Sequence, residues 1–72
     1  MRPYQHEILI PRSEARRRVG GISRATEHRR LKDEPEWPRP VAIGLGKSGY
    51  VQSEIDAYIA KKIAARDAGA GK

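Results

Sequence analysis

The sequence predicts a small α+β domain with three helices, a β-hairpin and a short N-terminal strand. A glycine pair, Gly20-Gly21, separates two segments of helical character, as at a turn between helices. A second glycine-rich stretch, residues 44–49, lies between two short β-prone runs, which is typical of a hairpin. Large apolar residues then recur at helical spacing: Ile55, Tyr58, Ile59 and Ile63.

The 72 residues allow one domain with one thin core. We expect a loose arm over residues 1–7, the folded domain over residues 8–66 and a disordered tail over residues 67–72. Further core positions come from the first two helices, the turn between them and a connector: Ala15, Val19, Ile22, Leu31 and Trp37. Core packing is also the favoured role of Tyr58, over that of a stacking platform for a base.

The first half of the domain is predicted to hold an edge strand and two helices. Residues 8–10 form a short apolar run that ends at Pro11, and a proline suits the first turn of a helix over residues 12–19. The glycine pair supplies the left-handed residue that ends this helix. Ser23 can cap a second helix, which runs over residues 23–33.

The second half is predicted to hold a connector, the hairpin and the third helix. The connector is Trp37-Pro38-Arg39-Pro40, because its prolines suit neither a helix nor a central strand. Residues 41–43 and 50–51 are the two strands, joined by a cationic glycine-rich loop. Ser53-Glu54-Ile55-Asp56 resembles a capping box and starts the third helix, which is predicted to reach Ala65.

The net charge of +6 is concentrated in one part of the chain. Residues 12–32 hold eight Lys or Arg against two acids, Glu14 and Glu27, whereas seven basic and seven acidic residues lie elsewhere. Arginines concentrated on one motif suit a polyanion, because the guanidinium group matches phosphate and guanine edges. The alternative is that the arginines at 16–18 are only an exposed helix face. We also expect Glu27 and Arg30 to pair on the surface of the second helix.

The composition argues against an enzyme, a metalloprotein and a membrane protein. There is no cysteine, and His6 and His28 lack ligand spacing, so we expect no metal and no cofactor. No paired-carboxylate or Ser/His/Asp set is visible. The loop ending in Gly46-Lys47-Ser48 lacks the first glycine of a phosphate loop. No apolar run approaches the roughly 20 residues that span a bilayer, and no signal peptide is visible, so a cytoplasmic location is expected.

A short helix, a glycine turn and a polar, cationic second helix form the outline of a helix-turn-helix. With a strand before them and a hairpin and helix after them, the expected order is that of a winged helix-turn-helix. Arg24 and His28, on the exposed front of the second helix, are the candidates for contacts with base edges of double-stranded DNA. The candidates for contacts with the DNA backbone are Ser23, Thr26, Arg29, Lys32, Lys47 and Ser48.

Four stretches between about residues 8 and 65 carry a family resemblance. They are Gly21-Ile22-Ser23-Arg24-Ala25-Thr26, then Arg29, then Trp37-Pro38-Arg39-Pro40-Val41-Ala42-Ile43-Gly44, then Gly49-Tyr50-Val51-Gln52-Ser53-Glu54-Ile55-Asp56-Ala57-Tyr58. In this order they resemble the AlpA-type regulators of phages and other mobile elements. These are small relatives of the MerR DNA-binding domain and overlap with excisionases, also called recombination directionality factors.

The resemblance implies that the second helix enters the major groove and that the hairpin is a wing on the flanking backbone. It also implies a prophage or other mobile-element setting, with two roles: transcription regulation, or excision, in which the protein bends DNA and directs a tyrosine integrase. The chain departs from the family at Glu27, His28 and Arg30, where relatives usually carry apolar or aromatic residues. These departures leave the facing of the second helix open.

The third helix is shorter than the dimerisation helix of larger MerR proteins, and its large apolar residues are assigned to the core. We therefore expect a monomer in solution that self-associates on DNA and binds repeated sites cooperatively. The alternatives are an AlpA-type transcription regulator with no architectural role, an RNA-binding protein and a protein-interaction module. An RNA-binding protein would more often interleave aromatic residues with its basic patch, and residues 12–32 contain none. An interaction module would not need all its net charge on one motif.

Overall fold

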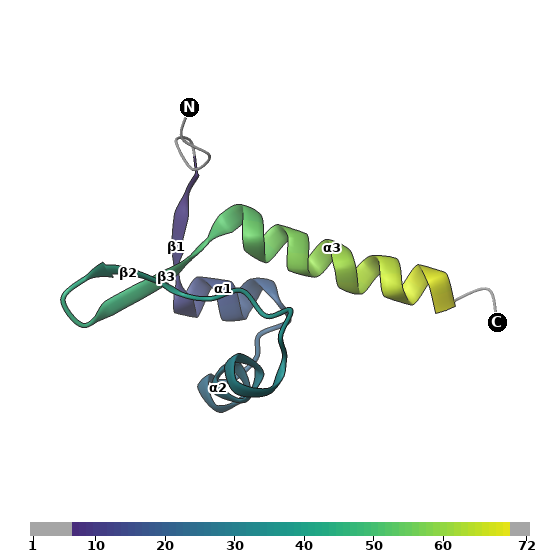
Figure 1. Cartoon of the computed structure of the whole chain (residues 1–72), viewed down its shortest axis with the longest axis horizontal. Helices are drawn as coiled ribbons and strands as arrows, with labels where there is room; N and C mark the ends of the chain where they lie inside the picture. The colour runs from purple at the N-terminus through teal and green to yellow at the C-terminus, as the bar shows by residue number, and fades with distance from the viewer. Residues whose placement is uncertain (1–6, 70–72) are drawn as a thin grey trace.

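The computed structural model describes residues 7–69, so the expected arm at residues 1–6 and the last residues of the expected tail, 70–72, lie outside it. The elements follow in the order β1 (Leu9–Pro11), α1 (Arg12–Arg18), α2 (Arg24–Asp33), β2 (Val41–Gly44), β3 (Lys47–Val51) and α3 (Gln52–Gly69) (Figure 1). The prediction of an α+β domain with three helices and a β-hairpin is confirmed.

The three strands form one antiparallel sheet in which β3 lies between β1 and β2. β1 is therefore an edge strand, as predicted. Ile10 of β1 lies opposite Tyr50 of β3, and both side chains are buried on the face that meets the helices. The backbone N–H of Gln52, the first residue of α3, donates to the carbonyl oxygen of Ile8 at 2.7 Å. This bond fixes the start of α3 beside β1.

The hairpin turn is tighter than predicted. Gly44 pairs with Lys47, so the turn consists of Leu45 and Gly46 alone, and the expected six-residue loop is wrong. Gly46 has φ +66°, which supplies the left-handed residue that lets the chain reverse within two residues. The strands consequently extend to the end of the hairpin, which projects from the body of the molecule (Figure 1).

The signals that delimit α1 and α2 act as predicted. Gly20 and Gly21 both have positive φ after the end of α1. The Ser23 hydroxyl oxygen accepts a hydrogen bond from the backbone N–H of Thr26 at 3.1 Å, so Ser23 is the N-cap of α2. These local contacts set the direction in which α2 leaves the turn, and therefore which of its faces meets the rest of the domain.

α3 is longer than predicted at both ends. It begins at Gln52, so Ser53 lies inside the first turn and not before it, and it continues past Ala65 to Gly69. The expectation of a disordered tail is therefore wrong for residues 67–69. The alanines and lysines after Tyr58 are good helix formers, and nothing interrupts them before Gly69. Within residues 7–69, no helix has both the length and the hydrophobicity to cross a membrane.

The core lies between the sheet, α1 and the first half of α3, and its buried members are Ile10, Ala15, Trp37, Tyr50, Ile55 and Tyr58. Trp37 packs edge-on against Tyr50 and Tyr58, with ring centroids 6.0 and 5.0 Å away. The predictions of a buried Trp37 and of a packing role for Tyr58 are confirmed. Ile63 is 46% exposed, so its assignment to the core is wrong. The projecting hairpin and α3 give the molecule a flat shape with extents of 48 × 35 × 19 Å.

Candidate nucleic-acid interface

A buried carboxylate holds α2 against the rest of the domain. Glu27 is 1% exposed, so its predicted pairing with Arg30 on the helix surface is wrong. Its Oε2 accepts hydrogen bonds from Arg12 Nε at 2.7 Å and from Tyr50 Oη at 2.5 Å, and its Oε1 accepts one from Arg16 Nη1 at 2.9 Å. Three elements, α1, α2 and β3, therefore meet at this one side chain.

The titration of the buried groups follows from these contacts. Burial alone would raise the pKa of Glu27, but the hydrogen bonds from Tyr50, Arg12 and Arg16 outweigh it, and the pKa is lowered. Burial, followed by the hydrogen bond to Glu27, raises the pKa of Tyr50 to about 12. Tyr50 Oη also accepts a hydrogen bond from Trp37 Nε1 at 3.0 Å. The glutamate is thus ionised and the tyrosine neutral at physiological pH.

Arg12 extends this network to the hairpin. Its Nη1 donates to Ser48 Oγ at 3.3 Å while its Nε holds Glu27, so one guanidinium group joins α2 to β3. Ser48, which was predicted to contact the DNA backbone, is half-buried and accepts this hydrogen bond, while its own O–H can still donate to a phosphate. Its role within this structure is to fix the hairpin relative to the helices.

The other arginines of α1 are paired on the surface. Arg17 Nη2 and Arg18 Nε both bind Glu14, the latter at 2.9 Å, and these hydrogen bonds lower the pKa of Glu14. The three arginines at 16–18 are therefore not a uniform exposed face, because Arg16 instead turns inward to Glu27. Both acids of residues 12–32 are neutralised by α1.

Arg30 is separated from the other basic residues of α2. Its guanidinium carbon lies 5.6 Å from the centre of the Trp37 ring, and its Nη1 donates to Tyr58 Oη at 3.3 Å. With Glu27 and Arg30 both facing the domain, the rotation of α2 is fixed. The departures from the family at Glu27, His28 and Arg30 left open which face of α2 meets the domain, and in this structure it is the face with Glu27 and Arg30.

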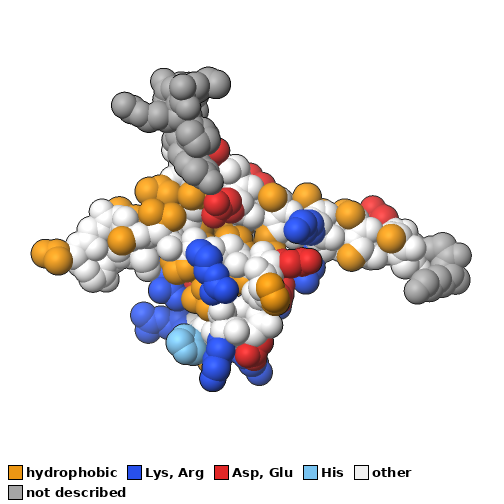
Figure 2. Space-filling model, viewed as in Figure 1, with side chains coloured by type: hydrophobic (Ala, Val, Ile, Leu, Met, Phe, Trp, Pro, Cys, Tyr) orange, Lys and Arg blue, Asp and Glu red, His pale blue; other side chains and the backbone are white. Residues whose placement is uncertain are grey.

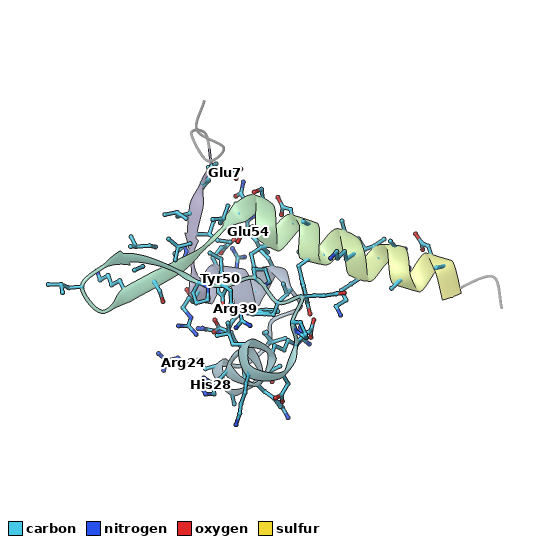
Figure 3. The ribbon with its side chains drawn as sticks, viewed as in Figure 1. Glu7, Arg24, His28, Arg39, Tyr50 and Glu54 are labelled. Atoms are coloured by element: carbon cyan, nitrogen blue, oxygen red, sulfur yellow. The ribbon has the colours of Figure 1, made fainter. Side chains whose placement is uncertain are left out.

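The remaining basic side chains of α2 point outward. Arg24, His28, Arg29 and Lys32 are all exposed, and Figure 3 shows Arg24 and His28 on the side of α2 nearer the hairpin. Arg29 Nη2 donates to Thr26 Oγ1 at 3.4 Å. In the described part of the chain, Arg24, His28 and Lys32 make no side-chain hydrogen bond or ion pair, so their donors face solvent.

A groove separates the N-terminal half of α2 from the hairpin. Four of the eight predicted contact residues line it, namely Arg24, His28, Lys47 and Ser48, together with Arg12, Ser13 and Arg16 of α1. The other four, Ser23, Thr26, Arg29 and Lys32, belong to the cap and body of α2 and do not line it. In Figure 2 the Lys and Arg side chains gather around α2, with the histidine among them.

No family model, curated protein or solved structure matches this chain.

The chemistry of the groove therefore has to be inferred from its own residues. Within residues 7–69, no three His, Asp or Glu side chains are placed to hold a metal ion. Arg24, His28 and Lys47 all offer hydrogen-bond donors to the same space, while Glu27, the acid in the groove, is saturated by Arg12 and Arg16. This arrangement suits an extended, negatively charged ligand.

No pattern in the sequence assigned Arg12, Ser13 and Arg16 to the groove. Only the concentration of arginine on both sides of the glycine pair pointed to this region. The contacts that place Arg12 and Arg16 join residues 15 and 11 positions apart in the chain. Such separations leave no periodic pattern in the sequence.

Proposed function

We propose that the chain is a sequence-specific double-stranded DNA-binding protein of winged helix-turn-helix type, with α2 as the recognition helix and the β2–β3 hairpin as the wing. The observation that carries the proposal is the groove where Arg24 and His28 of α2 face Lys47 of the hairpin. Glu14 and Glu27 are already paired with the arginines of α1, so Arg24, His28 and Lys47 are available to an outside partner.

Each exposed side chain has a role in this proposal. A major groove about 12 Å wide admits one helix, and the base edges face its exposed front. Arg24 and His28 lie there, near the start of α2, where recognition helices contact bases. Arg29 and Lys32 lie farther along α2 and suit phosphates, as does Lys47 on the wing. Ser23 and Thr26 serve mainly to cap the helix.

The biological role proposed here rests on the resemblance to AlpA-type regulators. In that role the protein acts in a mobile element as an excisionase, a transcription regulator or both, through cooperative binding and bending of DNA. A tyrosine integrase would be its protein partner in excision. The simpler variant is a regulator of an integrase gene that binds one site and does not shape the DNA.

The first experiment selects duplexes from a random pool and measures affinity against salt. If Arg29, Lys32 and Lys47 each neutralise one phosphate, log affinity should fall with log salt at a slope of about −2.7. Arg17→Ala is the matched control, because Arg17 is paired with Glu14 away from the groove. A slope near zero, or equal affinity for single-stranded RNA, would contradict the proposal of a sequence-specific protein for duplex DNA.

A second experiment separates the architectural role from simple regulation. Light scattering without DNA should show a monomer, and a long selected site should show stepwise shifts as copies are added. A bend that grows with each copy supports the excisionase role. A stable dimer without DNA that occupies one palindrome would instead support an ordinary transcription regulator.

A further inference from the structure

The tip of the hairpin carries an apolar side chain that contacts nothing else in the domain. Leu45 is 101% exposed, more than any other large hydrophobic residue in the described part of the chain. Its neighbours, Gly44 and Gly46, have no side chains that could cover it. In Figure 2 the hairpin ends in a hydrophobic side chain that stands beyond the rest of the surface.

The fold does not require a leucine at this position. The turn needs a positive φ at Gly46, and within residues 7–69 no residue other than glycine has one. Asn, Asp or Ser at position 45 would suit a turn at least as well and would not expose apolar surface. Single exposed leucines are common on protein surfaces. Leu45 differs because it lies at the end of a projecting hairpin, and the same hairpin carries Lys47, which lines the groove between α2 and the hairpin.

We infer that Leu45 is a wedge that enters the minor groove of bound DNA and inserts between two stacked base pairs. The inference rests on the proposed function, because it needs α2 in the adjacent major groove. Leucine is among the apolar side chains that proteins insert at such steps, where they unstack the bases and kink the duplex by about 20–90° towards the major groove.

The shape of the hairpin tip suits this role. The minor groove is only about 6 Å wide, and a two-residue turn with glycine on both sides of Leu45 presents a narrow end. Lys47, two residues away, would lie at the phosphates that border the groove. Leu45 would then select a flexible pyrimidine–purine step, because such steps unstack most easily. The protein would thereby read a position outside the bases that α2 touches.

The test places the fluorescent base 2-aminopurine at each step of the selected duplex in turn. At saturating protein, the wild type should brighten it at one step flanking the α2 site, and Leu45→Met should do the same. Leu45→Ala should leave it as dim as in free duplex and should reduce the bend measured by energy transfer. A mismatch at that step should raise wild-type affinity by about tenfold but leave that of Leu45→Ala unchanged.

Two controls make the outcomes distinguishable. Leu45 contacts nothing, so Leu45→Ala should keep the wild-type unfolding midpoint. Lys47→Ala should bind more weakly but unstack the same step once saturated.

If Leu45→Ala still unstacks and bends the DNA, the inference is wrong while DNA binding stands. If it loses cooperativity and keeps the unstacking, Leu45 docks on a neighbouring copy, which also overturns the wedge. If the wild type binds no duplex, the proposed function itself fails.

Discussion

The basic residues of α1 pair with acids of the domain, whereas those of α2, apart from Arg30, face solvent. All four arginines of α1 bind an acid, either Glu27 or Glu14. On α2, Arg24, Arg29 and Lys32 are exposed and, among the described residues, form no ion pair. The difference arises because Glu27 faces inward from α2 towards Arg12 and Arg16, while Glu14 of α1 pairs with the other two arginines. The net charge of a segment is therefore a poor measure of the charge that it presents to a partner.

The largest expected effect is a loss of stability when Glu27, the acid that binds Arg12 and Arg16, is removed. Glu27→Ala should lower the free energy of unfolding by about 3–5 kcal/mol, because the guanidinium groups of Arg12 and Arg16 lose their buried counter-charge. Urea unfolding followed by Trp37 fluorescence would measure it. Glu14→Ala is the control and should leave the midpoint nearly unchanged, since its pairs lie at the surface. Equal stability of Glu27→Ala and the wild type would contradict the internal role given to α1.

The next effect concerns the tyrosine of the same network. The pKa of Tyr50 is raised to about 12 in the fold, against 10.0 for an ordinary tyrosine, so folding favours its neutral form. This contribution is fully present below pH 10 and is lost as the pH rises to about 12, at a cost of about 2–3 kcal/mol. Tyr50→Phe lacks the titrating group, so its stability deficit relative to the wild type should shrink over that range. Tyr58, whose pKa is also raised, titrates in both proteins. A deficit that stays constant from pH 9 to 12 would show that Tyr50 does not titrate as described.

The third prediction compares the effect on DNA binding of replacing one arginine of α2 and one arginine of α1. Arg24→Ala should cost about 1–3 kcal/mol of binding to the selected duplex and relax its sequence preference, with unchanged stability. Arg17→Ala should change neither property much, since its guanidinium group is committed to Glu14. Competition binding against point-substituted duplexes measures both. If Arg24→Ala weakens every sequence equally, Arg24 contacts a phosphate and not a base.

Local signals were sufficient to predict most of the fold. The capping hydroxyl of Ser23, the positive φ at the glycine pair and the buried Trp37 each follow from a residue and its near neighbours. The errors at the hairpin and at the ends of α3 concern boundaries, where a tight two-residue turn and an uninterrupted run of helix formers extend the elements.

The candidate site was predicted less completely, because its architecture depends on distant contacts. A glutamate in a polar helix is normally exposed, and burial of Glu27 depends on Arg16, Arg12 and Tyr50, which lie 11, 15 and 23 positions away in the chain. The sequence did predict Arg24, His28 and Lys47, which the structure brings to one groove. It could not predict that all four arginines of α1 pair with Glu14 or Glu27.

The smallest expected effect is on the salt dependence of DNA binding, and it is tested with one lysine that faces the groove and one that is already paired with an acid. Lys47 borders the groove. Lys62, on α3, does not line the groove, and its Nζ lies 3.3 Å from Oε2 of Glu34 at the end of α2. Lys47→Ala should weaken specific and unrelated duplexes alike and make the salt slope shallower by about 0.9, one phosphate contact. The ratio of wild-type to variant affinity should then shrink by about 3.5-fold between about 50 and 200 mM salt. Lys62→Ala should leave the slope unchanged, because its charge is already matched. Equal slope changes for the two lysines would mean that DNA meets a uniformly cationic surface, and the division between internal and partner-facing charge would no longer describe how this protein binds.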